Sequence, residues 1–281
     1  VPENSEIFLI MKDYNIKNSI TKKQESKKRR IEKQTAALYA DLFNRNTDRE
    51  FFQKSQNYIS RIKIKKDWFV GKTCLDAGCG SGIASHGFAT INQTKVIAFD
   101  LGWLCLNIAR KRLRGLNNFS PIQASIGAIP FKDNSFDFIN CNGVLHHLLD
   151  PDTALSEISR VLKPGGLFFI GVYGRGGLMN ECKISICRLL AKFIPYLLLR
   201  KLLWVKNKNE LLYNICVPIR RPFSEEEIRN KLLYSGFSKI TRIAEDFYHL
   251  PSNCWQKIII GPDGMYLHFL AKKDGDNEKR G

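Results

Sequence analysis

The sequence predicts an α/β protein built on a doubly wound, mostly parallel sheet. Three observations predict this class. Short apolar runs alternate with amphipathic ones from residue 73 to residue 173, as they do in successive βαβ units. Glycines follow the first apolar run at alternate positions, and polar residues end the later runs. In such folds, ligands bind at the carboxyl ends of the strands.

The composition is that of a globular protein with one core domain and additions. The chain has 281 residues, of which 44% are hydrophobic. Its 8 cysteines form no C-x-x-C pair and no regular framework, and no secretory signal opens the chain. Cysteines in apolar runs behave as small hydrophobes, so we expect a cytoplasmic protein without a metal site.

The chain is strongly basic, with 44 basic and 27 acidic residues and a formal charge of +17. This charge suits nucleic acid, an anionic membrane face or an acidic substrate. A general richness in Lys, Asn and Ile explains the same charge without any partner. Composition alone therefore leaves these interpretations open.

Five segments divide the chain. Residues 1–34 are polar and lysine-rich and predict a basic arm or a solvated helix, with a nucleic-acid arm as the alternative. Residues 35–173 hold amphipathic helices and the alternating core. A helical cap is predicted over 174–222, completion of the core over 223–271, and a charged tail over 272–281.

The stretch from Thr73 to Gly82 organises the predicted fold. Its first residues end a buried strand, and Gly78, Gly80 and Gly82 allow positive φ angles and close approach of a ligand. A helix then begins at Ile83, with its free N–H groups toward the ligand. The pattern indicates a nucleotide-type cradle, which serves NAD, FAD and S-adenosylmethionine alike.

The same alternation predicts the later elements. Further strands are predicted over 95–100, 135–141, 167–173, 239–244 and 265–271, and helices over 103–113, 152–162 and 225–236. The residues Lys163–Gly166 predict a turn before the strand that starts at residue 167. Gly78, Asp100 and Asn142 all fall at carboxyl ends of strands, where a ligand is expected.

The segment from Leu189 to Trp204 is apolar but contains cations and Pro195. These residues argue against a membrane-spanning helix. Two alternatives remain. The segment could lie on a membrane surface, or it could form a cap that packs against the core.

Five ordered motifs resemble those of class I S-adenosylmethionine-dependent methyltransferases, in particular the group with a methyltransferase type 11 core. They are LDAGCGSG at 75–82, IAFD at 97–100, IPFKDNSFD at 129–137, VLHH at 144–147 and RVLKPGG at 160–166. The resemblance is close over 70–173 and looser over 222–271. It implies a Rossmann-like, seven-stranded, mostly parallel sheet with N-terminal helices and a helical cap insertion, and S-adenosylmethionine as the cofactor.

The resemblance also implies a cofactor site. Asp76 is expected to orient the ligand's ammonium group or the glycine loop, and Asp100 to bind the ribose hydroxyls, with a helix N-cap as the alternative role for Asp100. Ser125 stands where the family usually has an acidic residue that contacts adenine. The predicted cofactor-binding residues are Asp76, Ala77, Gly78, Cys79, Gly80, Asp100, Leu101, Ser125, Ile126 and Asn142.

A base is needed only when the methyl acceptor must lose a proton. His147 is the candidate base, because a histidine can take a proton near neutral pH. His146 is expected to shape the pocket. Tyr14, Tyr39 and His249 are further candidates for the pocket.

The basic, apolar cap predicts the acceptor. We expect methyl transfer to an O or N atom of a small molecule that is acidic or linked to a lipid or sugar. A tRNA or protein methyltransferase that uses the basic surface is one alternative, and a non-catalytic scaffold that binds S-adenosylmethionine is another. Peripheral contact with a membrane is compatible with each of these, and no transmembrane segment is expected.

Overall fold

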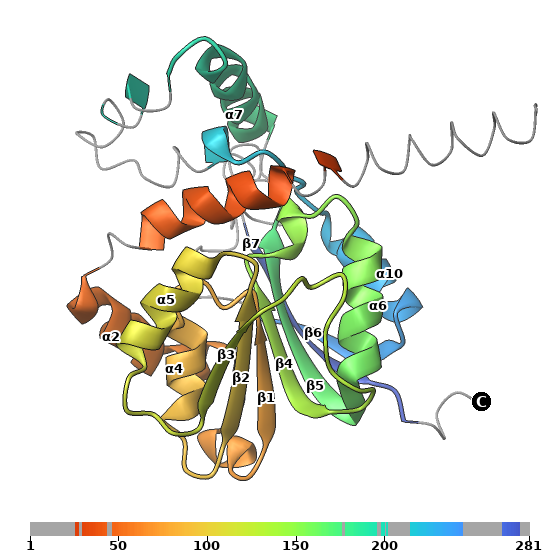
Figure 1. The fold of residues 1–281 in the computed structure, drawn as a ribbon. Coiled ribbons are helices and arrows are strands. Elements are labelled where there is room, and N and C mark those ends of the chain that lie inside the picture. Colours follow the sequence, from red (N-terminus) through yellow and green to blue (C-terminus); the bar gives the residue numbers. More distant parts are fainter. Residues whose placement is uncertain are drawn as a thin grey trace, which may run out of the picture.

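The computed structural model describes residues 26–27, 30–43, 47–175, 178–195, 198–199, 201, 214–243 and 266–275. Tyr14, His249, most of the predicted basic arm and the end of the predicted tail lie outside these residues. A seven-stranded sheet in the order β3-β2-β1-β4-β5-β7-β6 forms the centre, with helices on both faces (Figure 1). This confirms the predicted fold class.

The strands are β1 (Thr73–Ala77), β2 (Lys95–Asp100), β3 (Phe119–Gln123), β4 (Phe136–Asn142), β5 (Leu162–Tyr173), β6 (Phe237–Arg242) and β7 (Tyr266–Lys273). The helices are α2 (Asp48–Gln56), α3 (Tyr58–Arg61), α4 (Ile83–Ala89), α5 (Trp103–Arg112), α6 (Pro151–Val161), α7 (Leu178–Ala191) and α10 (Glu225–Tyr234). Two short 3-10 turns are η1 (Lys66–Phe69) and η2 (Leu145–His147). Residues 30–43 and 214–216 are also helical.

Strands β1 to β5 pair in parallel, and β7 pairs antiparallel with both β5 and β6. The chain runs outward from β1 through β2 to β3 and then returns to β4 on the other side of β1. The order of the strands therefore reverses between β1 and β4. In an open α/β sheet, the ligand crevice lies at the carboxyl ends of the strands that flank such a reversal.

Buried apolar residues cover both faces of the sheet. On one face, Leu155 and Ile158 of α6 and Ile228 of α10 are buried in one cluster with strand residues. On the other face, Phe69 and Phe88 pack with Phe138 of β4 in a second cluster. Two cores of this kind hold the central strands rigid and fix the positions of the strand ends.

Strand β3 was missed by the sequence analysis, because Pro121 lies in its middle. Pro121 lacks an N–H group, but β3 is an edge strand that pairs with β2 alone, and an edge strand tolerates proline. The predicted turn at Lys163–Gly166 is an irregularity inside a longer strand. Leu162 pairs with Phe136 and Leu167 with Phe138, so residues 163–166 bulge between two points of the ladder.

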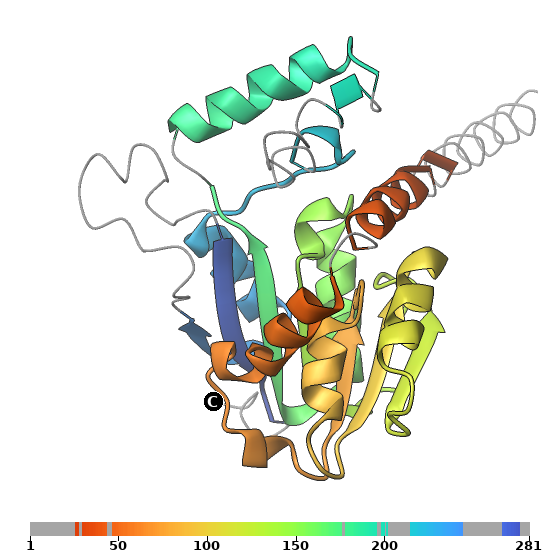
Figure 2. The same ribbon diagram turned by 90° about the vertical axis from the view of Figure 1, so that its left-hand side faces the viewer.

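Two segments lie at the carboxyl ends of the strands. The helix over residues 30–43 crosses the ends of β1 and β4, and α7 lies farther out at the same end of the molecule (Figure 2). Helical residues 214–216 and the extended residues after them lie between α7 and the sheet, since Arg188 of α7 donates to their carbonyl groups. These segments cover the carboxyl ends of the strands. Residues 214–221, which lie between α7 and the cavity, are called the roof below.

Candidate active site

The loop after β1 folds tightly onto the end of β2. The N–H groups of Gly78 and Cys79 both donate to the carbonyl oxygen of Phe99, at 2.8 and 2.9 Å. Gly78 and Gly80 have φ angles of +77° and +52°, in the left-handed region that favours glycine. A Cβ on Gly78 would collide with the side chain of Val144, so the loop leaves no room for a larger residue there.

Asp76 supports this loop from below. It is buried, and its carboxylate accepts hydrogen bonds from Ser85 Oγ at 2.5 Å and Asn140 Nδ2 at 2.7 Å. Asn140 in turn accepts from the hydroxyl of Tyr58 at 2.8 Å. Burial raises the pKa of Asp76, and the hydrogen bonds from Ser85 and Asn140 act in the opposite direction. This network fixes the end of β1 rather than facing a ligand.

Asp100 joins the glycine loop to the start of α5. Its two carboxylate oxygens accept from the N–H groups of Gly80 at 2.9 Å and Gly102 at 2.7 Å. Burial raises the pKa of Asp100, and these two hydrogen bonds oppose the rise. The N-cap residue of α5 is Gly102, so the structure does not give Asp100 the N-cap role that was its alternative.

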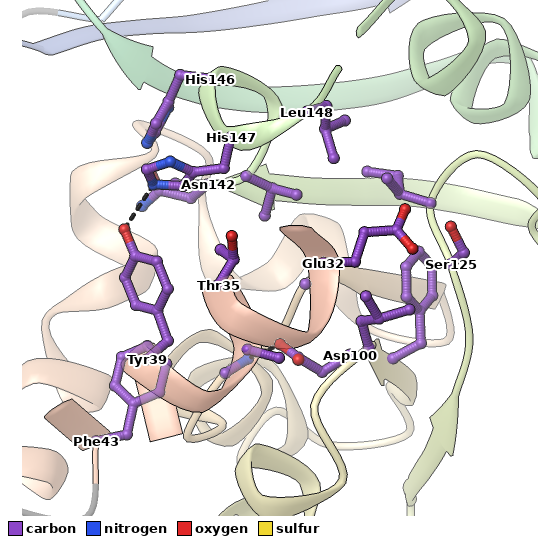
Figure 3. A pocket seen from close by; sticks show the side chains of 18 of the residues that line it. Glu32, Thr35, Tyr39, Phe43, Asp100, Ser125, Asn142, His146, His147 and Leu148 are labelled. Atoms are coloured by element: carbon purple, nitrogen blue, oxygen red, sulfur yellow. Dashed lines mark hydrogen bonds between the residues drawn. The ribbon is translucent and has the colours of Figure 1, made fainter. Parts of the chain in front are cut away.

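A cavity of about 360 Å³ opens above these elements (Figure 3). Most of the predicted site residues line it: Gly78, Gly80, Asp100, Leu101, Ser125, Ile126, Asn142 and His147. Asp76, Ala77 and Cys79 do not line it, because β1 runs beneath the loop and these side chains lie within the fold. The structure thus brings together residues from the ends of four neighbouring strands, β3, β2, β1 and β4.

The helix over residues 30–43 supplies one wall of the cavity, one of the two placements expected for the amphipathic helices from residue 35, the other being the edge of the sheet. Glu32, Thr35, Tyr39 and Phe43 point into the cavity from successive turns of this helix (Figure 3). An added Cβ on Gly80 would lie 2.5 Å from the ring of Phe43, so this helix sits directly on the glycine loop. Of these residues, Tyr39 alone was named as a pocket candidate. The helical spacing was a visible signal, but it did not show which surface the helix covers.

Tyr39 and His147 form a hydrogen-bonded pair at one end of the cavity. The Tyr39 hydroxyl lies 2.5 Å from His147 Nε2, and His147 Nδ1 lies 2.8 Å from the carbonyl oxygen of Ile219. A carbonyl only accepts, so Nδ1 carries the imidazole proton and Nε2 accepts from the Tyr39 hydroxyl. The orientation of both rings follows from these two contacts.

Burial, together with the charges of Arg220 and Arg188, lowers the pKa of His147 to about 4, although the hydrogen bond to the Ile219 carbonyl acts in the opposite direction. The imidazole is therefore neutral at pH 7. His146 is buried beside it and stacks on Tyr173 at 3.8 Å between ring centroids. Its Nδ1 accepts from the Tyr173 N–H at 3.2 Å, which supports the expected role in shaping the pocket.

Arginines of the cap hold the roof of the cavity. Arg188 Nη1 donates to the carbonyl oxygens of Asn214 at 2.8 Å and Val217 at 2.9 Å. Arg220 makes two hydrogen bonds to Glu181, at 2.7 and 2.8 Å, and lies over the ring of Tyr173. Among the described residues that line the cavity, none is Lys or Arg. Its other lining side chains are mainly apolar or aromatic.

Two kinds of feature are absent from the part of the chain that the structure describes. No group of three or more His, Cys, Asp or Glu side chains is placed to hold a metal ion. Likewise, none of the described helices combines the length and the apolar character needed to cross a membrane.

Comparisons with known proteins point to one kind of domain. Residues 75–170 match a family described as a methyltransferase domain. The ubiquinone/menaquinone biosynthesis C-methyltransferase of Escherichia coli is 36% identical over 105 residues, which are 36% of this chain and 42% of that protein. The chain spans less than half the length of the curated relatives that it matches.

Solved structures share the fold. A SAM-dependent methyltransferase of Thermotoga maritima superimposes with a TM-score of 0.52 over 85% of this chain and 99% of its own, at 18% identity. The [4+2]-cyclase SpnF superimposes with a TM-score of 0.51 over 79% of this chain and 80% of its own, at 17% identity. The same fold therefore also carries a protein named for a different reaction.

Proposed function

Because residues 75–170 form a methyltransferase domain of the class I fold, we propose that the protein transfers a methyl group from S-adenosylmethionine to a small, apolar acceptor beneath the cap. One observation carries the proposal. The glycine loop and Asp100 line the same cavity as the Tyr39–His147 pair. A cofactor site and a group able to hold an acceptor proton thus share one enclosed space.

The residues present fit the cofactor. Gly78 and Gly80 line the cavity with backbone alone, while Val144 and Phe43 pack close against them. A carboxylate has about four lone-pair directions, and Asp100 uses two for the N–H groups of Gly80 and Gly102. The other two can accept from a pair of ribose hydroxyls. Ser125 and Ile126 line the cavity beyond Asp100, where we propose that they contact the adenine.

S-adenosylmethionine supplies an electrophilic methyl group, so the protein needs chiefly to position the acceptor and exclude water. The apolar side chains of Leu42, Val144 and Leu148 line the cavity and are suited to excluding water. Asn142, at the end of β4, lines the cavity beside His147 (Figure 3). We propose that it borders the point of transfer.

The Tyr39–His147 pair can orient an acceptor and receive its proton. The Tyr39 hydroxyl donates its proton to His147 Nε2, and a phenol oxygen is an acceptor as well as a donor, so we propose that it faces an O–H or N–H group of the acceptor. With a His147 pKa of about 4, protonation at pH 7 is uphill by about 4 kcal/mol. The pair is thus a weak base. It would take the proton only as the acceptor bonds to the methyl group.

The lining of the cavity bears on the acceptor. No described lining residue is cationic, because Arg188 and Arg220 bond within the cap. An acidic acceptor would find no cationic side chain among the described lining residues, so we propose the lipid-linked form of the expected acceptor instead. Oxygen or nitrogen remains the proposed acceptor atom. The name of the Escherichia coli relative supports carbon as the alternative.

The test is a screen with radiolabelled S-adenosylmethionine against fractionated lipids, polar metabolites, RNA and protein from cells. Label in the lipid fraction, lost in an Asp100→Asn variant, is the expected result. Label in the polar acidic fraction would overturn the choice of acceptor but leave methyl transfer intact. Label in RNA or protein would support the alternative that uses the basic surface, and its binding should weaken steeply with salt.

A role without methyl transfer is the second candidate, because a protein of this fold is named as a [4+2]-cyclase. Calorimetric titration with S-adenosylmethionine separates the cases. Binding together with labelled product supports the enzyme. Binding without product in any fraction supports a scaffold, and the absence of binding excludes both.

A further inference from the structure

The outer face of α7 is apolar and exposed. Ile186, Leu189 and Leu190 of α7 lie at the i, i+3, i+4 spacing of a helix face, and Phe193 follows in the turn just after the helix. The exposed fractions of these four side chains lie between 56% and 81%. Single exposed apolar residues are ordinary, but four of them within eight positions make an apolar stripe at this end of α7.

The opposite face of α7 explains why this stripe points outward. Glu181, Ile184 and Arg188 lie on the inner face, where Ile184 is buried and the two charged residues bond to the roof segment. On a helix with 3.6 residues per turn, the stripe is centred about half a turn away from these three residues. The inner contacts therefore fix α7 with its apolar stripe turned away from the segment that Arg188 and Glu181 contact.

The charge of this segment has one sign. Residues 182–209 contain no Asp or Glu. Within them stand the basic residues Lys183, Arg188, Lys192, Arg200, Lys201, Lys206 and Lys208. The acid of α7, Glu181, is on the inner face with Arg220. An apolar stripe beside cations, without acids, matches a surface that is apolar inside and anionic outside.

We propose that the outer face of α7 docks on an anionic lipid bilayer, with its apolar stripe among the acyl chains and Lys183 and Lys192 among the headgroups. A helix of 14 residues with cations cannot cross the bilayer, so it would lie in the interface. The roof of the cavity, bonded to the inner face of α7, would then stand next to the membrane. This inference does not require methyl transfer to occur.

The experiment is co-sedimentation of the full-length chain with vesicles of phosphatidylcholine alone and of equal parts phosphatidylcholine and phosphatidylglycerol. The wild-type protein should bind the anionic vesicles and bind less as salt rises. A double variant, Leu189→Ser with Phe193→Ser, should lose about tenfold or more in affinity. Lys183→Gln with Lys192→Gln should lose affinity for anionic vesicles alone.

Matched control variants remove exposed apolar side chains and exposed lysines at positions away from α7. Leu233→Ser with Tyr234→Ser changes two exposed apolar residues of α10, and Lys65→Gln with Lys66→Gln removes two exposed cations. Both controls should bind as the wild type does. The basic N-terminal residues are intact in every variant, so a loss confined to the α7 variants assigns the binding to α7. Unchanged melting temperatures exclude misfolding of these surface variants.

Three results would overturn the proposal. The first is no binding of the wild-type protein to either vesicle, and the second is equal binding to both. The third is unchanged binding of the Leu189→Ser, Phe193→Ser variant, which would leave the basic N-terminal segment as the cause. If sedimentation instead shows a dimer that this variant dissociates, without vesicle binding, the stripe contacts a second copy of the chain.

Discussion

The hydroxyl of Tyr39 donates a 2.5 Å hydrogen bond to Nε2 of His147, although the two residues are 108 positions apart in the chain. The carbonyl of Ile219, from a third segment, fixes the imidazole tautomer that makes this possible. The pair thus forms only when three segments are in place: the helix over residues 30–43, η2 and the roof. This dependence makes it a sensitive probe of the proposed site.

Replacing Tyr39 by Phe should slow turnover and leave cofactor binding unchanged. The variant keeps the ring but removes the hydroxyl, so the acceptor loses its partner and His147 Nε2 is left unpaired. We expect turnover to fall by about a hundredfold, the low end of the effect of a lost acid–base group, because the pair is a weak base. The measurements are kcat with the acceptor found in the screen and calorimetric titration of S-adenosylmethionine. Tyr234→Phe, at an exposed tyrosine, is the control, and equal kcat in Tyr39→Phe would make the pair structural.

An Asp100→Asn variant should bind S-adenosylmethionine about tenfold to a hundredfold more weakly, as expected when a charged acceptor becomes neutral. The amide is close in shape to the carboxylate, but it can accept only through one of its two terminal atoms. The contacts to Gly80 and Gly102 make some loss of stability possible, so the melting temperature is measured alongside affinity. An unchanged dissociation constant would remove Asp100 from the cofactor site.

Gly80 and Phe43 should be energetically coupled. Gly80→Ala adds a Cβ 2.5 Å from the Phe43 ring at a φ of +52°, so we expect unfolding to become easier by about 1–3 kcal/mol. In the double variant with Phe43→Ala, the part of this destabilisation that comes from the clash with the Phe43 ring should disappear. The part that comes from the positive φ angle of residue 80 should remain. Chemical denaturation of the four proteins gives the coupling energy, expected at about 1 kcal/mol. Strict additivity would mean that the helix over residues 30–43 does not rest on the glycine loop.

Acid should destabilise the fold through its buried histidines. Burial lowers the pKa of His268 to about 4, and the charges of Arg61 and Arg242 act in the same direction. The unfolded chain binds a proton near pH 6.5 and the folded chain does not, so stability falls as pH drops from about 6.5 to about 4. For one such histidine the loss between pH 7 and pH 5 is about 2 kcal/mol.

The variant His268→Gln isolates this contribution. Between pH 7 and pH 5, its free energy of unfolding should fall by about 2 kcal/mol less than that of the wild type. The raised pKa values of Asp76 and Asp100 act in the opposite direction, but they are common to both proteins and cancel in the difference. Parallel pH profiles of the two proteins would contradict the assignment of a lowered pKa to His268.

Arg220→Lys should raise the KM of the acceptor and leave cofactor affinity unchanged. A lysine cannot reproduce the two hydrogen bonds to Glu181 together with the third to Asn214, so the roof should loosen. The loss of stability should be about 1–3 kcal/mol, because Arg220 is largely buried. Arg175→Lys, in a more exposed pair with Glu227, is the control. An acceptor KM unchanged by Arg220→Lys would separate the roof from acceptor binding.

Much of the core could be predicted because its signals are local. The glycines after β1, the carboxylate at the end of β2 and the polar end of β4 each follow an apolar strand, and parallel pairing brings such ends together. Strand β3 was not predicted, because Pro121 lies in its middle and proline is rare inside strands. Its position at the edge of the sheet explains why the proline is tolerated. Asp76 was predicted to bind the cofactor or orient the glycine loop, and the structure places it beneath the loop, where it accepts from Asn140 of the neighbouring strand β4. Which residues surround β1 depends on the pairing of the strands and is not a local property of the sequence.

Periodicity and turn chemistry are properties of neighbouring residues, so the fold class, the glycine loop and most of the polar strand ends could be predicted from the sequence. The packing of the elements was needed to show that the helix over residues 30–43 forms a wall of the cavity and that Tyr39 meets His147. It also decided that the arginines of the cap bond within the roof. These contacts join segments far apart in the chain, and the packing of whole elements, rather than local pattern, sets which side chains meet.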